Sequence, residues 1–331
     1  MAKVLMKGNE AIGEAAIRAG CLNYFAYPIT PQSEVAEYLS RRMPEVGGTF
    51  LQGESEVAVG YMIFGASGCG ERVMTTSSSP GVSLMSEAIS YIASAQCPAV
   101  FVNIMRGGPG LGGILPSQGD YFQATKGGGH GDYRLFVMAP ASVQEAVEMV
   151  MKAFPIAEEY RTPVMILGDG LIGQMMEPVE FPDNLSSEPS NKDDWATSGM
   201  DYRKSKKRNL VKSLYLDSTQ LNDHNLLLKA KYEKMKKDIQ YESYNTDGDY
   251  KVLIVSYGTM SRVCKTAIDK LKEDGLEVGM IRPQTLFPFP EQAIYDAAVI
   301  DSCKLVVSIE MSMGQMVEEI IEQIQFFIQK A

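Results

Sequence analysis

The sequence predicts an α/β protein, in which a parallel β-sheet is covered by helices on both faces and a second, smaller α/β unit follows. Two observations lead to this prediction. Short apolar runs alternate with longer segments whose apolar residues recur at helical spacing, an order typical of parallel sheets. The alternation stops in a highly charged stretch and then resumes. We therefore expect a domain at 1–180, a charged connector with a helix at 181–249, and a smaller domain at 250–331.

In the first part, predicted strands and helices follow one another in turn. Apolar runs predict strands at 23–27, 49–52, 72–76, 98–105, 135–138 and 163–167. Helical spacing predicts helices at 7–19, 32–42, 57–66, 82–95 and about 143–159. We expect the strand at 49–52 to be buried. Gly20 suits the end of the first helix, and Ser142 suits the N-cap of the last.

The connector and the smaller domain have their own patterns. The connector carries a basic run at 204–208, which we interpret as a solvated face, and a candidate exposed helix at 221–241. In the smaller domain, the pattern predicts strands at 252–255, 276–281 and 305–309 and helices at 260–273, 291–298 and 314–329.

Composition limits the classes of protein to which the chain can belong. The 331 residues carry a formal net charge of −10, which argues against general nucleic-acid binding. The five cysteines are scattered and form no CxxC pair, so we expect no disulfide framework and no iron–sulfur or zinc site in this chain. No apolar run approaches the roughly 20 residues of a membrane span, and the first residues lack the features of a signal peptide. We therefore expect a cytoplasmic location without membrane contact.

Residues 53–60 place two carboxylates where a strand gives way to a helix. Ligands of open α/β sheets bind outside the carboxyl ends of the strands, so Glu54 and Glu56 are candidates for chemistry. A structural role is the alternative, because acids in a first turn favour the helix dipole and Ser55 suits the N-cap.

Two further side chains occupy strand ends. Thr30 follows the strand at 23–27 and precedes the next helix, and Arg106 directly follows the strand at 98–105. Thr30 also suits a structural N-cap with Pro31 in the first helical turn, and Arg106 also suits a strand-end salt bridge.

Two glycine motifs suggest other cofactor sites but lack the required context. Residues 108–113 match GxGxxG, yet Pro116 argues against the helix that a dinucleotide site needs. Residues 168–170 resemble the start of the metal–diphosphate motif of thiamine enzymes, but the charged, linker-like stretch after them lacks its second half. We therefore interpret Asp169 as a strand-end turn residue. His130 and His224 form no metal or triad pattern.

Several segments in order carry a family resemblance. They are YPITP at 27–31, QGESE at 52–56, TSSSPG at 76–81, RGGP at 106–109, KGGGHGD at 126–132, SYGT at 256–259 and EMSMGQM at 310–316. With these segments the chain resembles the alpha subunit of 2-oxoacid:ferredoxin oxidoreductases, most closely of the branched-chain (2-oxoisovalerate) type. The resemblance implies a pyrimidine-binding domain for thiamine diphosphate at 1–180 and a domain similar to the transketolase C-terminal domain at 250–331.

The resemblance also implies roles for single residues. Glu56 matches the glutamate that hydrogen-bonds N1′ of the thiamine aminopyrimidine and shuttles a proton there, and Glu54 is its rival, with a supporting part. Thr30 matches the threonine that contacts substrate or cofactor, and Arg106 matches the arginine that faces the substrate carboxylate.

Other residues near these segments receive weaker assignments. Ser78 and Ser79 precede a helix and either approach the cofactor or act as caps. Lys126, His130 and Asp132 are expected near the site, without an assigned role.

For the whole protein, the resemblance implies a subunit that works only in a complex. The reaction is oxidative decarboxylation of a 2-oxoacid to acyl-CoA, with electrons passed to ferredoxin. Magnesium and iron–sulfur clusters are expected on partner subunits, of which the family has beta, gamma and delta. A 2-oxoglutarate or pyruvate version of the same complex, and a non-catalytic α/β scaffold, are the alternatives.

Overall fold

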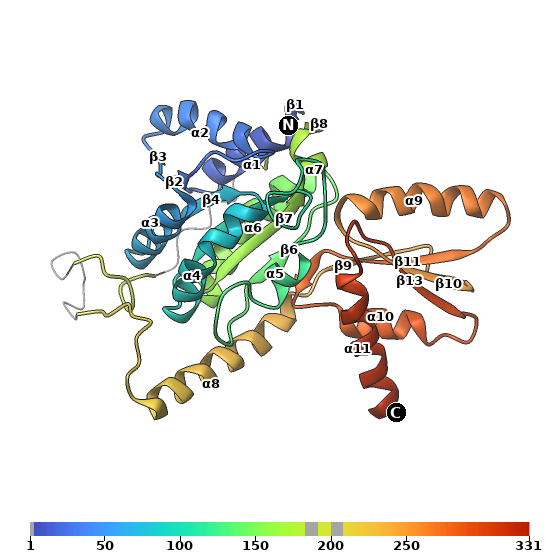
Figure 1. Cartoon of the computed structure of the whole chain (residues 1–331). Helices are drawn as coiled ribbons and strands as arrows, with labels where there is room; N and C mark the ends of the chain where they lie inside the picture. Colours follow the sequence, from blue (N-terminus) through green and yellow to red (C-terminus); the bar gives the residue numbers. More distant parts are fainter. Residues whose placement is uncertain (1–2, 183–190, 200–207, 331) are drawn as a thin grey trace.

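The computed structural model describes residues 3–182, 191–199 and 208–330. Most of the chain forms two α/β units, one around a seven-stranded sheet and one around a four-stranded sheet (Figure 1). Of the expected basic run at 204–208, only Arg208 lies within the described residues. In the described part of the chain, no helix has both the length and the apolar content to cross a membrane.

The seven-stranded sheet is the centre of the larger unit. Its order is β12-β6-β7-β5-β4-β2-β3, and all neighbours are parallel except β12 and β6. Its strands are β2 (Asn23–Ala26), β3 (Thr49–Gln52), β4 (Val73–Ser77), β5 (Ala99–Met105), β6 (Phe136–Met138), β7 (Pro163–Asp169) and β12 (Thr285–Phe287). The six predicted strands of this sheet are thus confirmed, and β12 is an additional edge strand.

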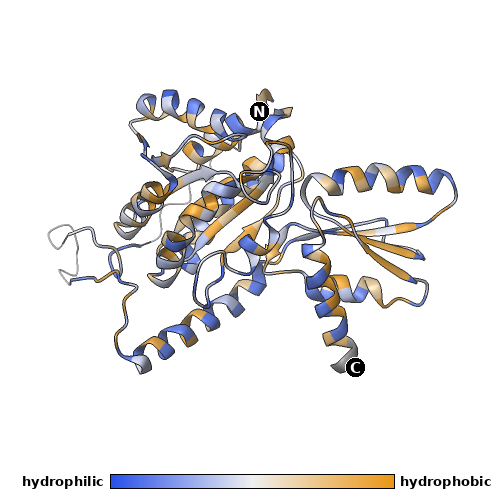
Figure 2. Ribbon diagram, in the orientation of Figure 1, coloured by the Kyte–Doolittle hydropathy of each residue, from blue (hydrophilic) through white to orange (hydrophobic). Residues whose placement is uncertain are grey.

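Helices cover both faces of this sheet. One face carries α1 (Gly8–Arg18), α2 (Ser33–Glu45) and α6 (Val143–Tyr160), and the other carries α3 (Glu56–Gly68), α4 (Ser79–Ser94) and α5 (Tyr121–Thr125). Side chains of β5 alternate between the two cores, with Val100 and Val102 in one and Ala99 and Phe101 in the other. Figure 2 shows the resulting pattern of apolar strands between helices with one polar face.

A short two-stranded ribbon lies beside α1. Strand β1 (Val4–Lys7) pairs in antiparallel fashion with β8 (Met176–Val179), and α7 (Gly170–Gln174) leads from β7 into β8. Gly8 accommodates this arrangement, because a Cβ there would lie 1.9 Å from the carbonyl oxygen of Ile172. The sequence pattern did not predict these short elements.

The smaller unit has a four-stranded sheet of order β13-β10-β11-β9, in which only β9 is antiparallel. Its strands are β9 (Tyr241–Tyr244), β10 (Val252–Val255), β11 (Val278–Pro283) and β13 (Leu305–Ser308). One face packs against α9 (Gly258–Glu273), and the other packs against α10 (Glu291–Ala298) and α11 (Gln315–Lys330).

The connector helix α8 (Ser218–Met235) runs along the outside of the larger unit and ends in a 3-10 turn, η1 (Lys236–Asp238) (Figure 1). Leu228, Tyr232 and Met235 are buried in the core beneath α6. The expected helix is therefore present, with one face buried and the others exposed.

Two local expectations are wrong. Strand β3 is exposed over most of its length, because it is the edge strand of its sheet. Helix α2 begins at Ser33, with Gln32 in the N-cap position, so Thr30 is not its cap and Pro31 is not in its first turn.

Each of the two sheets includes one strand from a distant part of the sequence. Strand β9, from the connector, completes the smaller sheet, and β12, from the C-terminal part, completes the larger one. Between them lies Arg282 on β11, whose guanidinium donates to both carboxylate oxygens of Glu145 on α6 at 2.8 and 2.7 Å. Its Nε donates to Glu242 on β9 at 2.7 Å, so one buried side chain joins the two units.

Candidate active site

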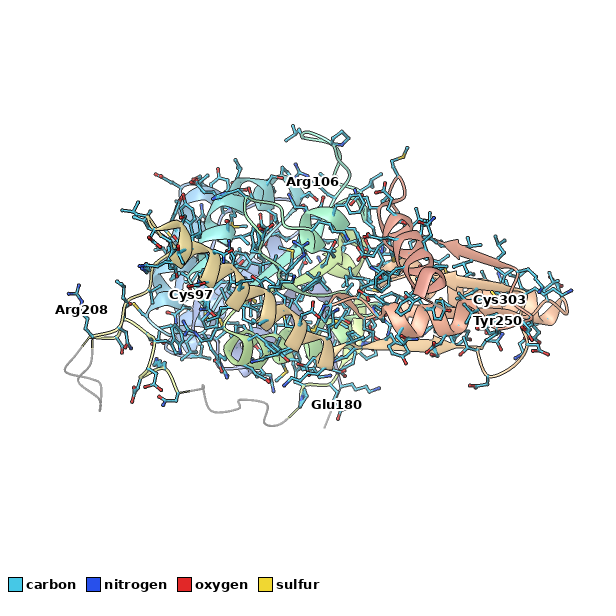
Figure 3. The ribbon with its side chains drawn as sticks, turned by 90° about the horizontal axis from the view of Figure 1, so that it is seen from below. Cys97, Arg106, Glu180, Arg208, Tyr250 and Cys303 are labelled. Carbon is cyan, nitrogen blue, oxygen red and sulfur yellow. The ribbon has the colours of Figure 1, made fainter. Side chains whose placement is uncertain are left out.

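The predicted site residues gather at the carboxyl edge of the large parallel sheet. Thr30 follows β2, Glu56 lies just beyond β3, Ser78 follows β4 and Arg106 follows β5. Parallel strands end at a common edge, so four segments far apart in sequence meet there. Figure 3 labels Arg106, which directly follows β5.

The two candidate carboxylates differ in burial. Glu56 opens α3 and is only 6% exposed, whereas Glu54 is exposed. Ser55 caps α3, since its side chain accepts a hydrogen bond from the amide of Ala58 at 3.3 Å. Within the described residues, the Glu56 carboxylate receives no hydrogen bond. Glu56 is therefore the buried carboxylate of the two, and its oxygens have unused hydrogen-bonding capacity.

The first turn of α4 lies next to the Glu56 side chain, and the residue of α4 that faces it is Gly81. A Cβ on Gly81 would lie 2.7 Å from Oε1 of Glu56 and 2.2 Å from Oγ of Ser77, so only glycine leaves the carboxylate where it is. The hydroxyls of Ser77 and Ser78 are buried and have no hydrogen-bond partner within the described residues. Ser78 occupies the N-cap position of α4, but its side chain makes no capping bond.

The loop that carries Thr30 is held by polar side chains that sequence reasoning missed. The amides of Asn9 and Gln174 both donate to the carbonyl of Pro31, at 2.8 and 3.1 Å. The buried side chain of Gln32 accepts a hydrogen bond from Thr76 on β4. Thr30 itself is exposed, and its position depends on these contacts.

Arg106 is 7% exposed and reaches back toward Thr30. Its Nη1 donates to the carbonyl of Thr30 at 2.9 Å, and its Nη2 donates to the carbonyl of Leu111 at 3.0 Å. Its Nε is buried without a partner, and among the described residues no carboxylate pairs with this guanidinium. The alternative of a strand-end salt bridge is therefore wrong, and a buried cation remains available for an anionic group.

The loop after Arg106 folds back on itself. The amide of Gly113 donates to the carbonyl of Gly107 at 2.9 Å, and the amide of Gly107 donates to the carbonyl of Leu115 at 3.0 Å. Gly112 has φ +59°, and a Cβ there would lie 1.8 Å from that Gly107 carbonyl oxygen. No helix opens directly from this GxGxxG match, as expected from Pro116, and the next helix, α5, begins only at Tyr121.

A second polar group at the site was not predicted. The hydroxyl of Ser79 donates to Oδ2 of Asp120 at 2.5 Å and accepts from the backbone amide of Arg106 at 3.1 Å. The side chain of Asn103 also donates to Oδ2 of Asp120, at 2.9 Å. Asp120 lies in an irregular polar stretch with no periodic pattern, so its spatial neighbours could not be derived from the sequence.

A groove with a volume of ≈ 980 Å³ lies between the two units and is lined in part by Ser79 and Asp120, whereas Glu56 and Arg106 are not among its lining residues. One wall comes from the start of α4 and from the glycine loop, which spans residues 107–113. The other wall comes from residues 310–315. Gln118 clamps the two walls, because its Oε1 accepts from the amide of Met311 at 2.8 Å and its Nε2 donates to the carbonyl of Tyr257 at 2.9 Å.

Three residues expected near the site have other surroundings. Lys126 pairs with Glu319 on α11 at 2.5 Å, and the exposed ring of His130 lies edge-on to Tyr91. Asp132 is exposed. Asp169 caps α7 by accepting from the amides of Leu171 and Ile172, as expected of a strand-end turn residue.

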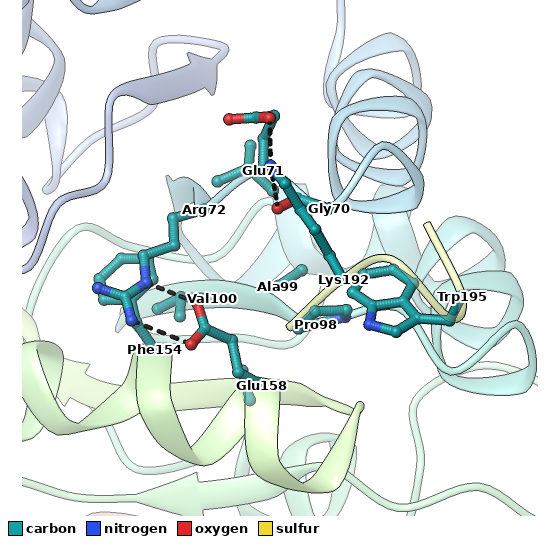
Figure 4. Close-up of a pocket in the computed structure, with 12 residues that line it drawn as sticks. Gly70, Glu71, Arg72, Pro98, Ala99, Val100, Phe154, Glu158, Lys192 and Trp195 are labelled. Carbon is teal, nitrogen blue, oxygen red and sulfur yellow. Dashed lines mark hydrogen bonds and ion pairs between the residues drawn. The ribbon is translucent and has the colours of Figure 1, made fainter. Parts of the chain in front are cut away.

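Another cavity lies at the opposite edge of the sheet, near the amino ends of β4 and β5 (Figure 4). Its lining includes Arg72 and Glu158, which form an ion pair of 2.6 Å, and Lys192, which bonds to Glu71 at 2.8 Å. Its free volume of ≈ 10 Å³ holds about one water molecule. The contacts that line this cavity hold the segment around Lys192 against the larger unit. Because the cavity is so small, we exclude it as a substrate site.

Comparison with protein families identifies the family of the chain. A family model described as "Pyruvate flavodoxin/ferredoxin oxidoreductase, thiamine diP-bdg" matches residues 14–242, and one described as "Pyruvate:ferredoxin oxidoreductase core domain II" matches residues 251–329. The chain belongs to the 2-oxoacid:ferredoxin oxidoreductase family. The family predicted from the motifs is thus confirmed, and with it a thiamine-dependent oxidoreductase subunit.

Relatives of this oxidoreductase subunit match it over nearly its whole length. It is 46% identical to "Ketoisovalerate oxidoreductase subunit VorB" of Methanothermobacter thermautotrophicus, over 97% of this chain and 89% of the relative. It is 39% identical to "2-oxoglutarate synthase subunit KorA" of Archaeoglobus fulgidus, over 96% of this chain and 90% of the relative.

Solved structures confirm the predicted fold class of the oxidoreductase subunit. A structure described as "2-oxoglutarate:ferredoxin oxidoreductase from Magnetococcus marinus with 2-oxoglutarate, coenzyme A and succinyl-CoA bound" superposes with a TM-score of 0.86 and 27% identity, over 97% of this chain and 60% of that one. A "Split gene transketolase, inactive beta4 tetramer" superposes with a TM-score of 0.56 and 15% identity, over 96% of this chain and 85% of that one, which shows a shared fold alone.

Proposed function

We propose that this chain is the alpha subunit of a complex that oxidatively decarboxylates a branched-chain 2-oxoacid to its acyl-CoA and passes the electrons to ferredoxin. The observation that carries the proposal is the buried Glu56 at the carboxyl edge of a sheet matched by a thiamine-binding family model. The branched-chain substrate is supported by 46% identity to a ketoisovalerate subunit, against 39% to a 2-oxoglutarate subunit. A 2-oxoglutarate or pyruvate substrate is the alternative.

The residues present fit thiamine diphosphate. The unpaired buried carboxylate of Glu56 offers an acceptor to a ring nitrogen, and the unpartnered hydroxyls of Ser77 and Ser78 offer further polar contacts. Gly81 keeps the space beside that carboxylate clear. When bound, thiamine diphosphate supplies the electron sink for decarboxylation.

Three residues of this chain have proposed roles in the reaction. Glu56 holds and exchanges the proton at N1′ of the aminopyrimidine. Arg106 binds the substrate carboxylate, for which a guanidinium is suited because it can donate two parallel hydrogen bonds. Thr30, whose carbonyl already contacts Arg106, also contacts the substrate or the cofactor. Glu54 has a supporting part.

We also propose that partner subunits complete the site. Apolar side chains of the loop after Arg106, part of which lines the groove, are exposed, among them Leu111 at 82% and Leu115 at 75%. Exposed apolar patches of this kind mark protein interfaces. By family resemblance, a beta subunit would cover this patch and carry the diphosphate, Mg²⁺ and an iron–sulfur cluster, with gamma and delta subunits completing a cytoplasmic complex.

The proposed domain division keeps its predicted bounds of 1–180, 181–249 and 250–331. The start of the second family match at residue 251 supports the last boundary. Strands β9 and β12 cross between the units, so the division describes the sequence more closely than it describes the sheets.

The test uses the complex assembled from this chain and its partner subunits without oxygen. We expect Glu56→Gln to lower kcat for 2-oxoacid-dependent ferredoxin reduction by at least about 10²-fold, since general acid–base catalysis contributes typically 10²–10⁴-fold. The matched control is Glu54→Gln, which removes a neighbouring exposed carboxylate and should keep most of the activity.

Three other outcomes would change the proposal. Unimpaired Glu56→Gln with an inactive Glu54→Gln would transfer the role to Glu54. A preference for 2-oxoglutarate or pyruvate in a panel of 2-oxoacids would keep the mechanism and change the substrate. A wild-type complex without thiamine-dependent turnover would favour the non-catalytic scaffold.

A further inference from the structure

We propose that Asp120 is a positioning residue that acts through Ser79 to hold Arg106 in the orientation that binds the substrate carboxylate. This inference rests on the proposed function of Arg106. The three residues come from three separate segments, namely the polar stretch after the glycine loop, the start of α4 and the end of β5. Their contact is produced by the fold alone.

A directed chain of hydrogen bonds links the three residues. The Ser79 hydroxyl has one proton, and its contact of 2.5 Å with Asp120 is much shorter than its 3.3 Å contact with the carbonyl of Arg106. The proton therefore goes to Asp120, in the length range of a hydrogen bond to a charged acceptor. A lone pair of the same oxygen then faces the backbone amide of Arg106, 3.1 Å away.

Arg106 is consequently held at both of its ends. Its backbone is fixed by Ser79, and its guanidinium is fixed by the carbonyls of Thr30 and Leu111. Its remaining N–H groups, including the buried unpartnered Nε, are left for other acceptors. A shift of the strand end would move that guanidinium relative to a bound carboxylate.

Asp120 is itself anchored from the second unit. Two residues before it, Gln118 bonds to Met311 and Tyr257, and two residues after it, the amide of Phe122 donates to the side chain of Gln315 at 2.8 Å. The stretch from 118 to 122 is therefore pinned on both sides, and Asp120 projects from a fixed backbone toward Ser79.

A purely structural explanation of Asp120 accounts poorly for its charge. It occupies the N-cap position of α5, but its side chain makes no capping bond. Burial raises the pKa of Asp120, so its ionised form opposes folding instead of supporting it. Asp120→Asn should therefore leave the stability of the fold unchanged or higher.

The experiment measures KM, kcat and cofactor affinity in the assembled complex. We expect Asp120→Asn and Ser79→Ala each to raise KM for the 2-oxoacid about tenfold with a smaller change in kcat, because they disturb a ground-state contact. The dissociation constant of thiamine diphosphate, from calorimetric titration, should stay within twofold. In an Arg106→Lys background, Asp120→Asn should have a smaller effect on KM, since coupled residues are not additive.

The matched control is Ser86→Ala, two turns further along α4. Within the described residues, the hydroxyl of Ser86 bonds only to the carbonyl of Ser83 in the same helix. Unchanged KM in both Asp120→Asn and Ser79→Ala would overturn the inference. A parallel rise in the thiamine dissociation constant, or full additivity with Arg106→Lys, would also overturn it, because Asp120 would then act elsewhere. A wild-type complex inactive toward every 2-oxoacid would instead overturn the proposed function, and this inference with it.

Discussion

At the scale of single residues, the space beside Glu56 is as important as the carboxylate itself. Gly81 lies in the first turn of α4, where a methyl group would meet Oε1 of Glu56 and Oγ of Ser77. The serine can rotate away, but the glutamate can yield only by moving its reactive atoms. Glycine at this place is thus explained by the site, although it weakens the helix.

The variant Gly81→Ala should separate activity from stability. Alanine favours a helix over glycine by about 0.8–1.0 kcal/mol, so the melting temperature of the complex should stay the same or rise. Displacement of the Glu56 carboxylate should lower kcat/KM by roughly 10²-fold. Gly65→Ala on α3, where a Cβ would meet nothing within 4 Å, is the control and should keep full activity. Equal activity of the two variants would show that the carboxylate tolerates the methyl group.

The sequence predicted the residues that directly follow strands and missed those that support them. Glu56 and Arg106 could be proposed because strand ends of a parallel sheet share one edge. Asp120, Gln32 and Asn9 could not, since they act through partners 17 or more residues away, which no local pattern reveals. Their neighbours depend on the packing of the finished fold.

At the scale of elements, the start of α3 decides where Glu56 points. Ser55 accepts from the amide of Ala58, which fixes the first turn that carries the glutamate. The cap was predicted from the sequence and is confirmed, because an N-cap is a local interaction.

The variant Ser55→Ala should therefore loosen the first turn of α3. Loss of an N-cap costs about 1 kcal/mol, which corresponds to roughly fivefold faster amide exchange there. Hydrogen–deuterium exchange of the assembled complex measures this, and activity should fall in parallel. Ser142→Ala removes the equivalent cap of α6 and should speed exchange there, with activity retained. Faster exchange at α3 without a loss of activity would show that the order of this first turn does not determine the position of Glu56.

Elements that depend on distant pairing were the ones missed. Strands β1, β8, β9 and β12 lie outside the runs that were predicted as strands. Each exists because a partner strand lies beside it. The exposed state of β3 has the same origin, since an apolar run does not reveal that its strand has a neighbour on one side only.

At the scale of the whole molecule, Arg282 fastens the smaller unit to the larger one. Its buried guanidinium contacts Glu145 and Glu242, which come from opposite sides of the junction. Burial alone would raise the pKa of the Glu145 carboxyl. The hydrogen bonds and the positive charge of Arg282 nevertheless hold this pKa below its usual value. A carboxylate of this kind stabilises the fold above its unfolded pKa and loses that contribution as the pH falls through its folded pKa.

The variant Arg282→Met should make the contribution of the Arg282–Glu145 pair to stability measurable. At pH 7 it should lower the free energy of unfolding by about 3 kcal/mol, since one partner of a buried ion pair is removed. The difference from wild type should shrink as the pH falls below the ordinary pKa of a glutamate, about 4.3. Urea unfolding at several pH values measures both effects, with the exposed Arg41→Met as the control. A difference that is constant with pH would show that Glu145 does not carry the coupling.

The crossing strands have a consequence for how this chain can be inherited. A gene divided near residue 250, where the composition changes, would give a first product that carries β9 without β11 and a second that carries β12 without β6. Each product would expose an unpaired strand edge, which promotes aggregation until the other product binds to it. Recombination that exchanges the smaller unit alone meets the same obstacle. The two units are therefore expected to evolve as one heritable block, joined to new partners at their ends and not at their middle.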